Sequence, residues 1–105
     1  MKSVLISALV AAGVMASAPA FANKDLATKS GCMACHAVDK KLVGPAYKDV
    51  AAKYKGDAGA PAHLFAKVRE GGSGVWGQVP MMAHPADKIS DDDLKAAIHW
   101  ILTLE

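Results

Sequence analysis

The sequence predicts a small all-α domain of about four short helices joined by long loops. The sustained alternation of apolar and polar residues that marks strands is missing, and aromatic residues make up only 6% of the chain. Alanine, lysine and leucine are abundant and favour helices. Proline before and glycine after several short segments supply helix boundaries.

Four segments carry these helix signals. The first three run over about residues 24–30, 46–55 and 62–70, and each ends near a glycine. The last segment has the clearest start, because Ser90 can cap it and Asp93 completes a capping box. The predicted buried face of this last helix consists of Leu94, Ala97, Ile98 and Ile101.

Residues 1–22 are typical of a cleaved secretory signal peptide rather than of the folded domain. Lys2 gives a positive start, residues 4–14 are apolar or small, and residues 20–22 (AFA) form a cleavage site. The apolar run is shorter than the roughly 20 residues that a membrane-spanning helix needs. We therefore expect a single mature domain over residues 23–105, soluble and exported to the periplasm.

The central motif is Cys32-Met33-Ala34-Cys35-His36, which contains the only two cysteines of the chain. Two cysteines with this spacing followed by histidine are typical of c-type haem attachment. Each thiol adds to one haem vinyl group, and His36 then falls under the ring, where it can bind iron. A chain this short also buries little surface, and a covalent haem would supply the missing core.

Other interpretations of the motif remain open on the motif alone. A thioredoxin-like redox pair calls for a βαβ context that is not visible, and a disulfide would leave the histidine unexplained. A zinc site would need a second pair of ligands, which His63, His84 and His99 do not supply at ligand spacing. The pattern also occurs by chance.

Two adjacent methionines, Met81 and Met82, follow Pro80 in the predicted loop between the third and last helices. Methionine commonly fills gaps in a core, but one of these sulfurs can instead bind iron opposite His36. Pro80 fixes its own φ and stiffens the approach to Met81, which favours Met81 as the ligand. Met82 stays an alternative, because the following loop is long.

Taken together, these segments resemble the small monohaem bacterial class I cytochromes c of the cytochrome c-551 (c8) type. The resemblance covers the whole mature chain and implies their fold, about four short helices wrapped around one covalently attached haem. The matching residues are 31–37 (GCMACHA), 43–53 (VGPAYKDVAAK), 74–77 (GVWG), 79–81 (VPM), 90–92 (SDD) and Trp100.

The resemblance also implies residue roles. Cys32 and Cys35 would carry the thioethers, His36 would be the proximal ligand and Met81 the distal one. The Pro45 carbonyl would accept the second ring N–H of His36, and Trp76 and Lys67 would contact a haem propionate.

One departure from the family is the run over residues 82–88, which lacks the usual Pro-Pro-Asn and its hydrogen bond to the methionine sulfur. His84 could replace that bond, although a position in solvent is the simpler expectation. His63 and His99 are expected on the surfaces of amphipathic helices.

These features predict an electron carrier, not an enzyme, because His36 and Met81 would leave iron no open position for a substrate. The resemblance suggests a quinol-oxidising complex as donor and a terminal oxidase or nitrite reductase as acceptor. We expect a monomer without membrane insertion, and the small net charge of +2 argues against nucleic-acid binding. The alternatives are a haem enzyme or gas sensor with open iron, and a subunit held permanently by an oxidase or reductase.

Overall fold

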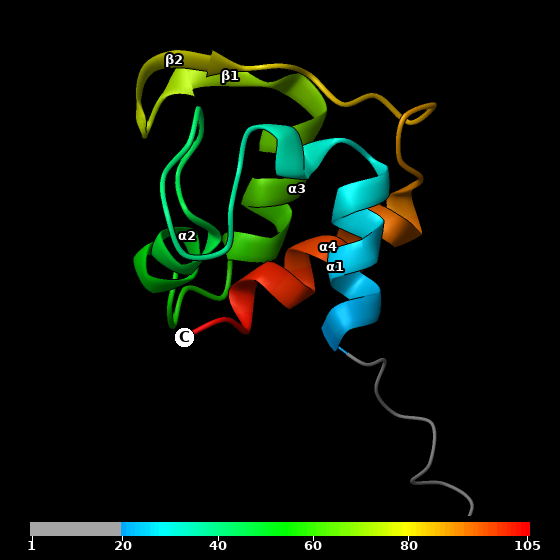
Figure 1. The fold of residues 1–105 in the computed structure, drawn as a ribbon, viewed down its shortest axis with the longest axis horizontal. Coiled ribbons are helices and arrows are strands. Elements are labelled where there is room, and N and C mark those ends of the chain that lie inside the picture. The colour runs from blue at the N-terminus through cyan, green and yellow to red at the C-terminus, as the bar shows by residue number, and fades with distance from the viewer. Residues whose placement is uncertain (1–19) are drawn as a thin grey trace, which may run out of the picture.

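The computed structural model describes residues 20–105, and side chains from Lys24 onward. It is mostly helical, as the sequence predicts, with one small hairpin at the end of the molecule opposite the C-terminus (Figure 1). In chain order the elements are α1 (Ala20–Lys29), the 3₁₀ helix η2 (Cys32–Ala34), α2 (Tyr47–Lys53), α3 (Ala60–Glu70), β1 (Gly72–Gly74), β2 (Gly77–Met81) and α4 (Asp91–Leu102).

The predicted signal peptide lies almost entirely outside the described residues, so its cleavage after Ala22 stays a prediction. In this uncleaved chain α1 begins at Ala20, four residues before the predicted start at residue 24. Among residues 20–105, no helix is both long and apolar enough to cross a membrane.

Helix α4 begins where its cap predicts. The Ser90 Oγ accepts a hydrogen bond from the Asp93 backbone N–H at 3.2 Å, and three aspartates fill the first turn, at the positive end of the helix dipole. Leu94, Ala97 and Ile98 are buried as predicted. The prediction for Ile101 is wrong in part: Ile101 is only half-buried, and Trp100 is buried instead.

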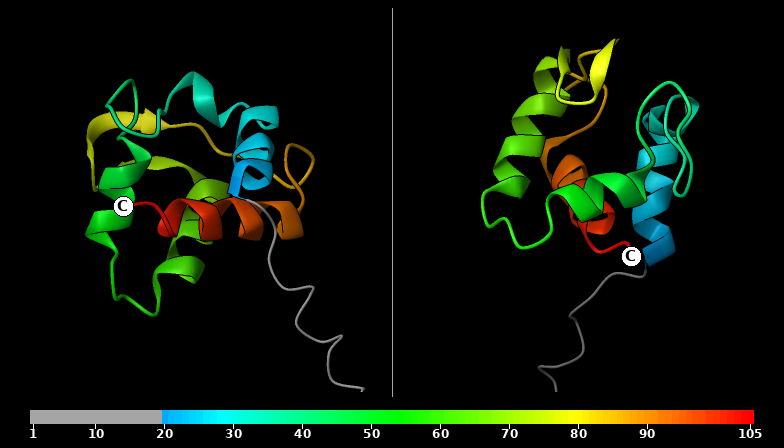
Figure 2. Two further views of the ribbon diagram at one scale, coloured as in Figure 1. Left: turned by 60° about the horizontal axis from the view of Figure 1, so that its bottom comes forward. Right: turned by 90° about the vertical axis from the view of Figure 1, so that its left-hand side faces the viewer.

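Trp100 is buried because α4 lies in the middle of the molecule and packs against α1, α2 and α3 (Figure 2). On one side Trp100 joins Ala27, Tyr47 and Val50 in a cluster, and its ring meets the Tyr47 ring edge-on at 5.8 Å. A second cluster lies toward α3 and consists of Ile89, Leu94 and Ile98 with the partly buried Leu64, Phe65, Val68 and Leu102. A helix buried on two sides needs more than a single apolar stripe.

The hairpin of β1 and β2 replaces part of the loop that the sequence predicts. The strands pair antiparallel, Gly72 with Met81 and Gly74 with Gly77, with an irregular register between. All β residues except Met81 are exposed, so the segment has no alternating pattern that could have revealed the strands. The hairpin affects the position of Met81, which becomes the last residue of β2.

Candidate functional site

The two cysteines and His36 are gathered on one turn directly after α1. Gly31 has a φ of 86°, the left-handed region that glycine adopts without strain, and this turns the chain out of α1. The Cys32 carbonyl then accepts hydrogen bonds from the backbone N–H groups of Cys35, at 3.2 Å, and His36, at 3.0 Å. Both cysteines are half-exposed and unpaired, so both sulfurs are available to a ligand.

His36 is the one buried polar side chain of the described core, at 8% exposure. Its Nδ1 lies 2.8 Å from the Pro45 carbonyl oxygen. A carbonyl can only accept, so Nδ1 carries the proton and donates it, and Nε2 keeps its lone pair. This is the contact that the family resemblance implies for Pro45, and it leaves Nε2 in the form that binds a metal.

Two further neighbours hold the His36 ring. The Tyr47 ring stacks on it, with centroids 4.6 Å apart and planes 17° apart. Gly44 approaches so closely that an added Cβ would lie 2.5 Å from Cε1 and 2.9 Å from either nitrogen. In the sequence, Gly44 and Tyr47 have no predicted role beyond their place in the matching segment, and only the fold brings them to His36.

Burial disfavours charge in the region around Cys32 and Tyr47. It raises the pKa of the Cys32 thiol above its ordinary value, and it raises the pKa of the Tyr47 phenol strongly. Both side chains therefore stay protonated at neutral pH, and they pack together in one apolar cluster. An uncharged surface of this kind suits a flat apolar ring.

Met81 and Met82 differ clearly in their surroundings. Met81 is half-buried, whereas Met82 is 73% exposed. The backbone at Met81 lies against the end of α3, where Gly71 has a φ of 72° and an added Cβ would lie 2.5 Å from the Met81 carbonyl oxygen. Gly71 therefore permits the close approach of β2 to the end of α3, and this approach determines the position of the Met81 backbone.

Trp76 and Lys67 both lie at the hairpin. Trp76 is 41% exposed in the turn between the strands, and the Lys53 Nζ from α2 lies 5.7 Å from the centre of its ring. Lys67 is half-buried on α3, and its Nζ would be 3.3 Å from a Cβ added at Gly72. Lys53 was not predicted as part of the site, and its position in the last turn of α2 is the only signal for it in the sequence.

The remaining histidines do not build a metal site. His63 and His99 are exposed on α3 and α4, as expected. His84 is half-buried, and its Nδ1 lies 2.9 Å from the Met82 carbonyl oxygen. No group of three or more potential metal-ligating side chains of the His, Cys, Asp and Glu types forms anywhere in residues 24–105, so the zinc interpretation gains no second ligand pair.

The residues present fit a covalently held haem. The loop after His36 and the β1–β2 hairpin lie at the same end of the molecule, on opposite sides of it (Figure 2, right). Exposed large apolar side chains lie on these two segments and on the residue after the hairpin, and they could cover a flat apolar group. They are Leu42, Val43, Val75, Trp76, Val79 and Met82. Two free thiols could attach the haem edge, and one oriented imidazole and one methionine thioether could bind its iron.

Comparison with known proteins agrees with this geometry. Cytochrome c-552 of Nitrosomonas europaea is 46% identical over 105 residues, which is 100% of both chains. Cytochrome c-551 of Pseudomonas aeruginosa is 44% identical over 98% of both chains. The crystal structure of wild-type Nitrosomonas europaea cytochrome c552 superposes with a TM-score of 0.71 at 52% identity, covering 78% of this chain and 99% of that one.

The sequence model of the family described as Cytochrome c matches residues 21–105. This match includes the segment that carries Cys32, Cys35 and His36, and the relatives align over nearly the whole chain. The chain therefore belongs to the cytochrome c family and carries one covalently bound haem c.

Proposed function

We propose that this protein is a periplasmic one-electron carrier whose iron is bound by His36 on one side and Met81 on the other. The observation that carries the proposal is the 2.8 Å contact between His36 Nδ1 and the Pro45 carbonyl. It sets the tautomer that leaves Nε2 free, and it makes the ring a better electron donor. When bound, the haem supplies reversible one-electron chemistry between Fe(III) and Fe(II).

The role of the protein chain is to hold this chemistry and to restrict it. Cys32 and Cys35 anchor the group through thioethers, and Tyr47 and Gly44 keep the His36 ring from turning. Met81 would be the second iron ligand, and its thioether would favour the reduced state and so raise the potential. With His36 and Met81 both bound to iron, no position would remain for a substrate, which favours a carrier over an enzyme or a gas sensor.

Two side chains at the hairpin, the aromatic Trp76 and the cationic Lys67, would contact the haem propionates. Trp76 can donate its indole N–H, and the Lys67 ammonium can pair with a carboxylate. Both side chains lie at the hairpin, Lys67 near Gly72 at the end that carries Met81 and Trp76 in the turn at the other end, which supports this role. The Lys53 ammonium over the Trp76 ring adds a further positive charge at the same place.

For partners, we propose a quinol-oxidising complex as electron donor and a terminal oxidase or nitrite reductase as acceptor. The exported state that residues 1–22 indicate would bring the carrier to the compartment where such complexes expose their haem or copper sites. We expect the carrier to be a monomer that binds each partner transiently.

The test compares Met81→Ala with Met82→Ala in the holoprotein. Ferric protein with a bound thioether shows a near-infrared sulfur–iron band. We expect Met81→Ala to abolish this band and to lower the reduction potential sharply, because the sulfur ligand is lost. Met82→Ala should keep both, because Met82 is 73% exposed. Near-infrared spectroscopy and a redox titration give the two readouts.

Four results would contradict the proposal. Loss of the band in Met82→Ala alone would move the ligand by one residue, and loss only in the double variant would make the two methionines interchangeable. A parent protein without the band would have no methionine bound to its iron, which removes the main reason to exclude an enzyme or sensor. The intact mass of the same holoprotein should equal residues 23–105 plus one haem, and retention of Met1 would contradict export by cleavage.

A further inference from the structure

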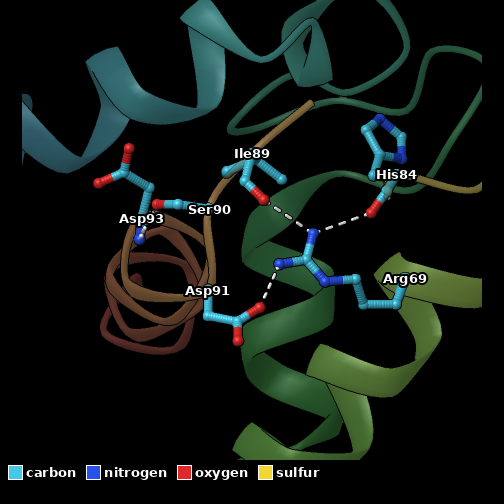
Figure 3. A network of polar contacts seen from close by, with 6 residues as sticks. All are labelled: Arg69, His84, Ile89, Ser90, Asp91 and Asp93. Atoms are coloured by element: carbon cyan, nitrogen blue, oxygen red, sulfur yellow. Dashed lines mark hydrogen bonds and ion pairs between the residues drawn. The ribbon is translucent and has the colours of Figure 1, made fainter. Parts of the chain in front are cut away.

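The side chain of Arg69 ties both ends of the segment after Met81 to α3 (Figure 3). Its Nη1 donates to the His84 carbonyl at 3.0 Å and to the Ile89 carbonyl at 2.8 Å, and its Nη2 donates to the Asp91 carboxylate at 2.6 Å. The three acceptors lie 15 to 22 residues further along the chain. One guanidinium thus joins α3, residues 82–90 and the start of α4.

The two carbonyl contacts matter more than the ion pair. Asp91 is 67% exposed, and exposed ion pairs contribute little to stability. The Arg69 side chain is only 16% exposed, with the Phe65 ring 5.1 Å from its Cζ, so its bonds to carbonyls are shielded from water. Hydrogen bonds from a charged donor are about twice as strong as neutral ones.

The clamp lies close to the proposed iron ligand. His84 follows Met81 by three residues, and three extended residues span at most about 11 Å. The backbone N–H of His84 also donates to the Val68 carbonyl at 2.9 Å, so α3 holds His84 at both its N–H and its C=O. On the other side, Gly71 lets the Met81 backbone lie against the end of α3, and Met81 pairs there with Gly72 in the hairpin. Met81 is therefore confined between two attachments to one helix.

We propose that Arg69 is a positioning residue for Met81: by fastening residues 84 and 89 to α3, it keeps the Met81 sulfur from leaving the iron. This inference rests on the proposed His36 and Met81 ligation. It assigns to Arg69 a function that depends on restraint of the loop, not on contact with the haem. A looser loop would let Met81 swing away more often, while the rest of the fold stays intact.

The experiment uses ferric holoprotein and the variant Arg69→Gln. Imidazole added from solution binds iron only after Met81 has left, so its limiting rate at high imidazole concentration measures how often Met81 leaves. We expect this rate to rise about tenfold, the factor expected when roughly one charge-assisted hydrogen bond is lost. The sulfur–iron band should also disappear on heating well before the far-ultraviolet circular dichroism changes.

Three further variants separate the clamp from general charge effects. Lys88→Gln also removes one positive charge, but from an exposed residue within residues 82–90. It should leave the imidazole-binding rate and the sulfur–iron band at parental values. Asp91→Asn removes only the exposed ion pair and should change the rate by less than threefold, consistent with the small energy of such pairs. Arg69→Lys keeps the charge but not the fork that reaches three acceptors, so its rate should lie between those of the parent and Arg69→Gln.

The inference is wrong if Arg69→Gln binds imidazole at the parental rate. It is also wrong if the band and the circular dichroism move together to lower temperature, because Arg69 would then stabilise only the fold. A parent protein without any sulfur–iron band would overturn the Met81 ligation itself, which is a separate and recognisable outcome.

Discussion

His36 is held by three neighbours of different kinds, and each limits a different motion of the ring. The hydrogen bond from Nδ1 to the Pro45 carbonyl restrains rotation of the ring about its Cβ–Cγ bond, and Tyr47 covers one face. The Gly44 backbone lies so close to Cε1 that an added Cβ would be 2.5 Å from it, so there is little room for the ring to tilt toward that side. The position of Nε2 is thus determined by the loop that follows the haem-binding motif.

At this residue scale, Gly44→Ala should disturb the ring most. The added Cβ would lie 2.5 Å from Cε1, so the ring or the loop must move. We expect a loss of about 1–3 kcal/mol in the free energy of unfolding, typical of overpacking. Denaturant unfolding measures this loss, and proton NMR should show faster exchange of the His36 Nδ1 proton.

Gly59→Ala provides the matched control. Gly59 has a φ of −87°, and an added Cβ would make only an ordinary 3.4 Å contact with the Asp57 carboxylate. Alanine there should be neutral or slightly stabilising. Equal stability of both variants, with an unchanged Nδ1 proton in Gly44→Ala, would show that the loop adjusts freely around His36.

Among the elements, α4 is central, because it packs against three other helices. A loss of stability in its first turn should therefore affect the whole domain. Ser90→Ala removes the acceptor for the Asp93 N–H, which should cost about 1 kcal/mol. For a domain of this size that corresponds to a fall of about 4–8 °C in the melting temperature. Ser90→Asn should restore most of the loss, because asparagine also caps helices. Equal melting temperatures for Ser90→Ala and Ser90→Asn would argue against the cap.

The contrast between α4 and the hairpin explains what the sequence can predict. Ser90 caps the helix through the backbone N–H of Asp93, three positions away, and the haem motif is equally local, so both are visible in the sequence. The strands lack an apolar face, and their pairing depends on where α3 ends. The Arg69 contacts lie far along the chain and two of them are to backbone carbonyls, which any residue supplies.

At the scale of the whole molecule, the protein part of the core is small. It is divided into two clusters, one around Trp100 and one around Ile98, and many of its buried members are alanines. In residues 24–105 no large side chain is fully buried. A chain of this size buries too little apolar surface to be stable with a wide margin. Covalently bound haem would extend this core between the loop after His36 and the hairpin.

Replacing both Cys32 and Cys35 with alanine should therefore leave the chain largely unfolded at 25 °C. The substitution removes the covalent haem, and small domains have only about 5–15 kcal/mol of stability to lose. Ala34→Ser is the matched control, because it changes an exposed residue of the same motif and keeps both thiols, so it should attach haem and melt like the parent. Far-ultraviolet circular dichroism against temperature distinguishes the variants. A haem-free double variant that unfolds cooperatively near the midpoint of the holoprotein would show that the two clusters suffice for the fold without the haem.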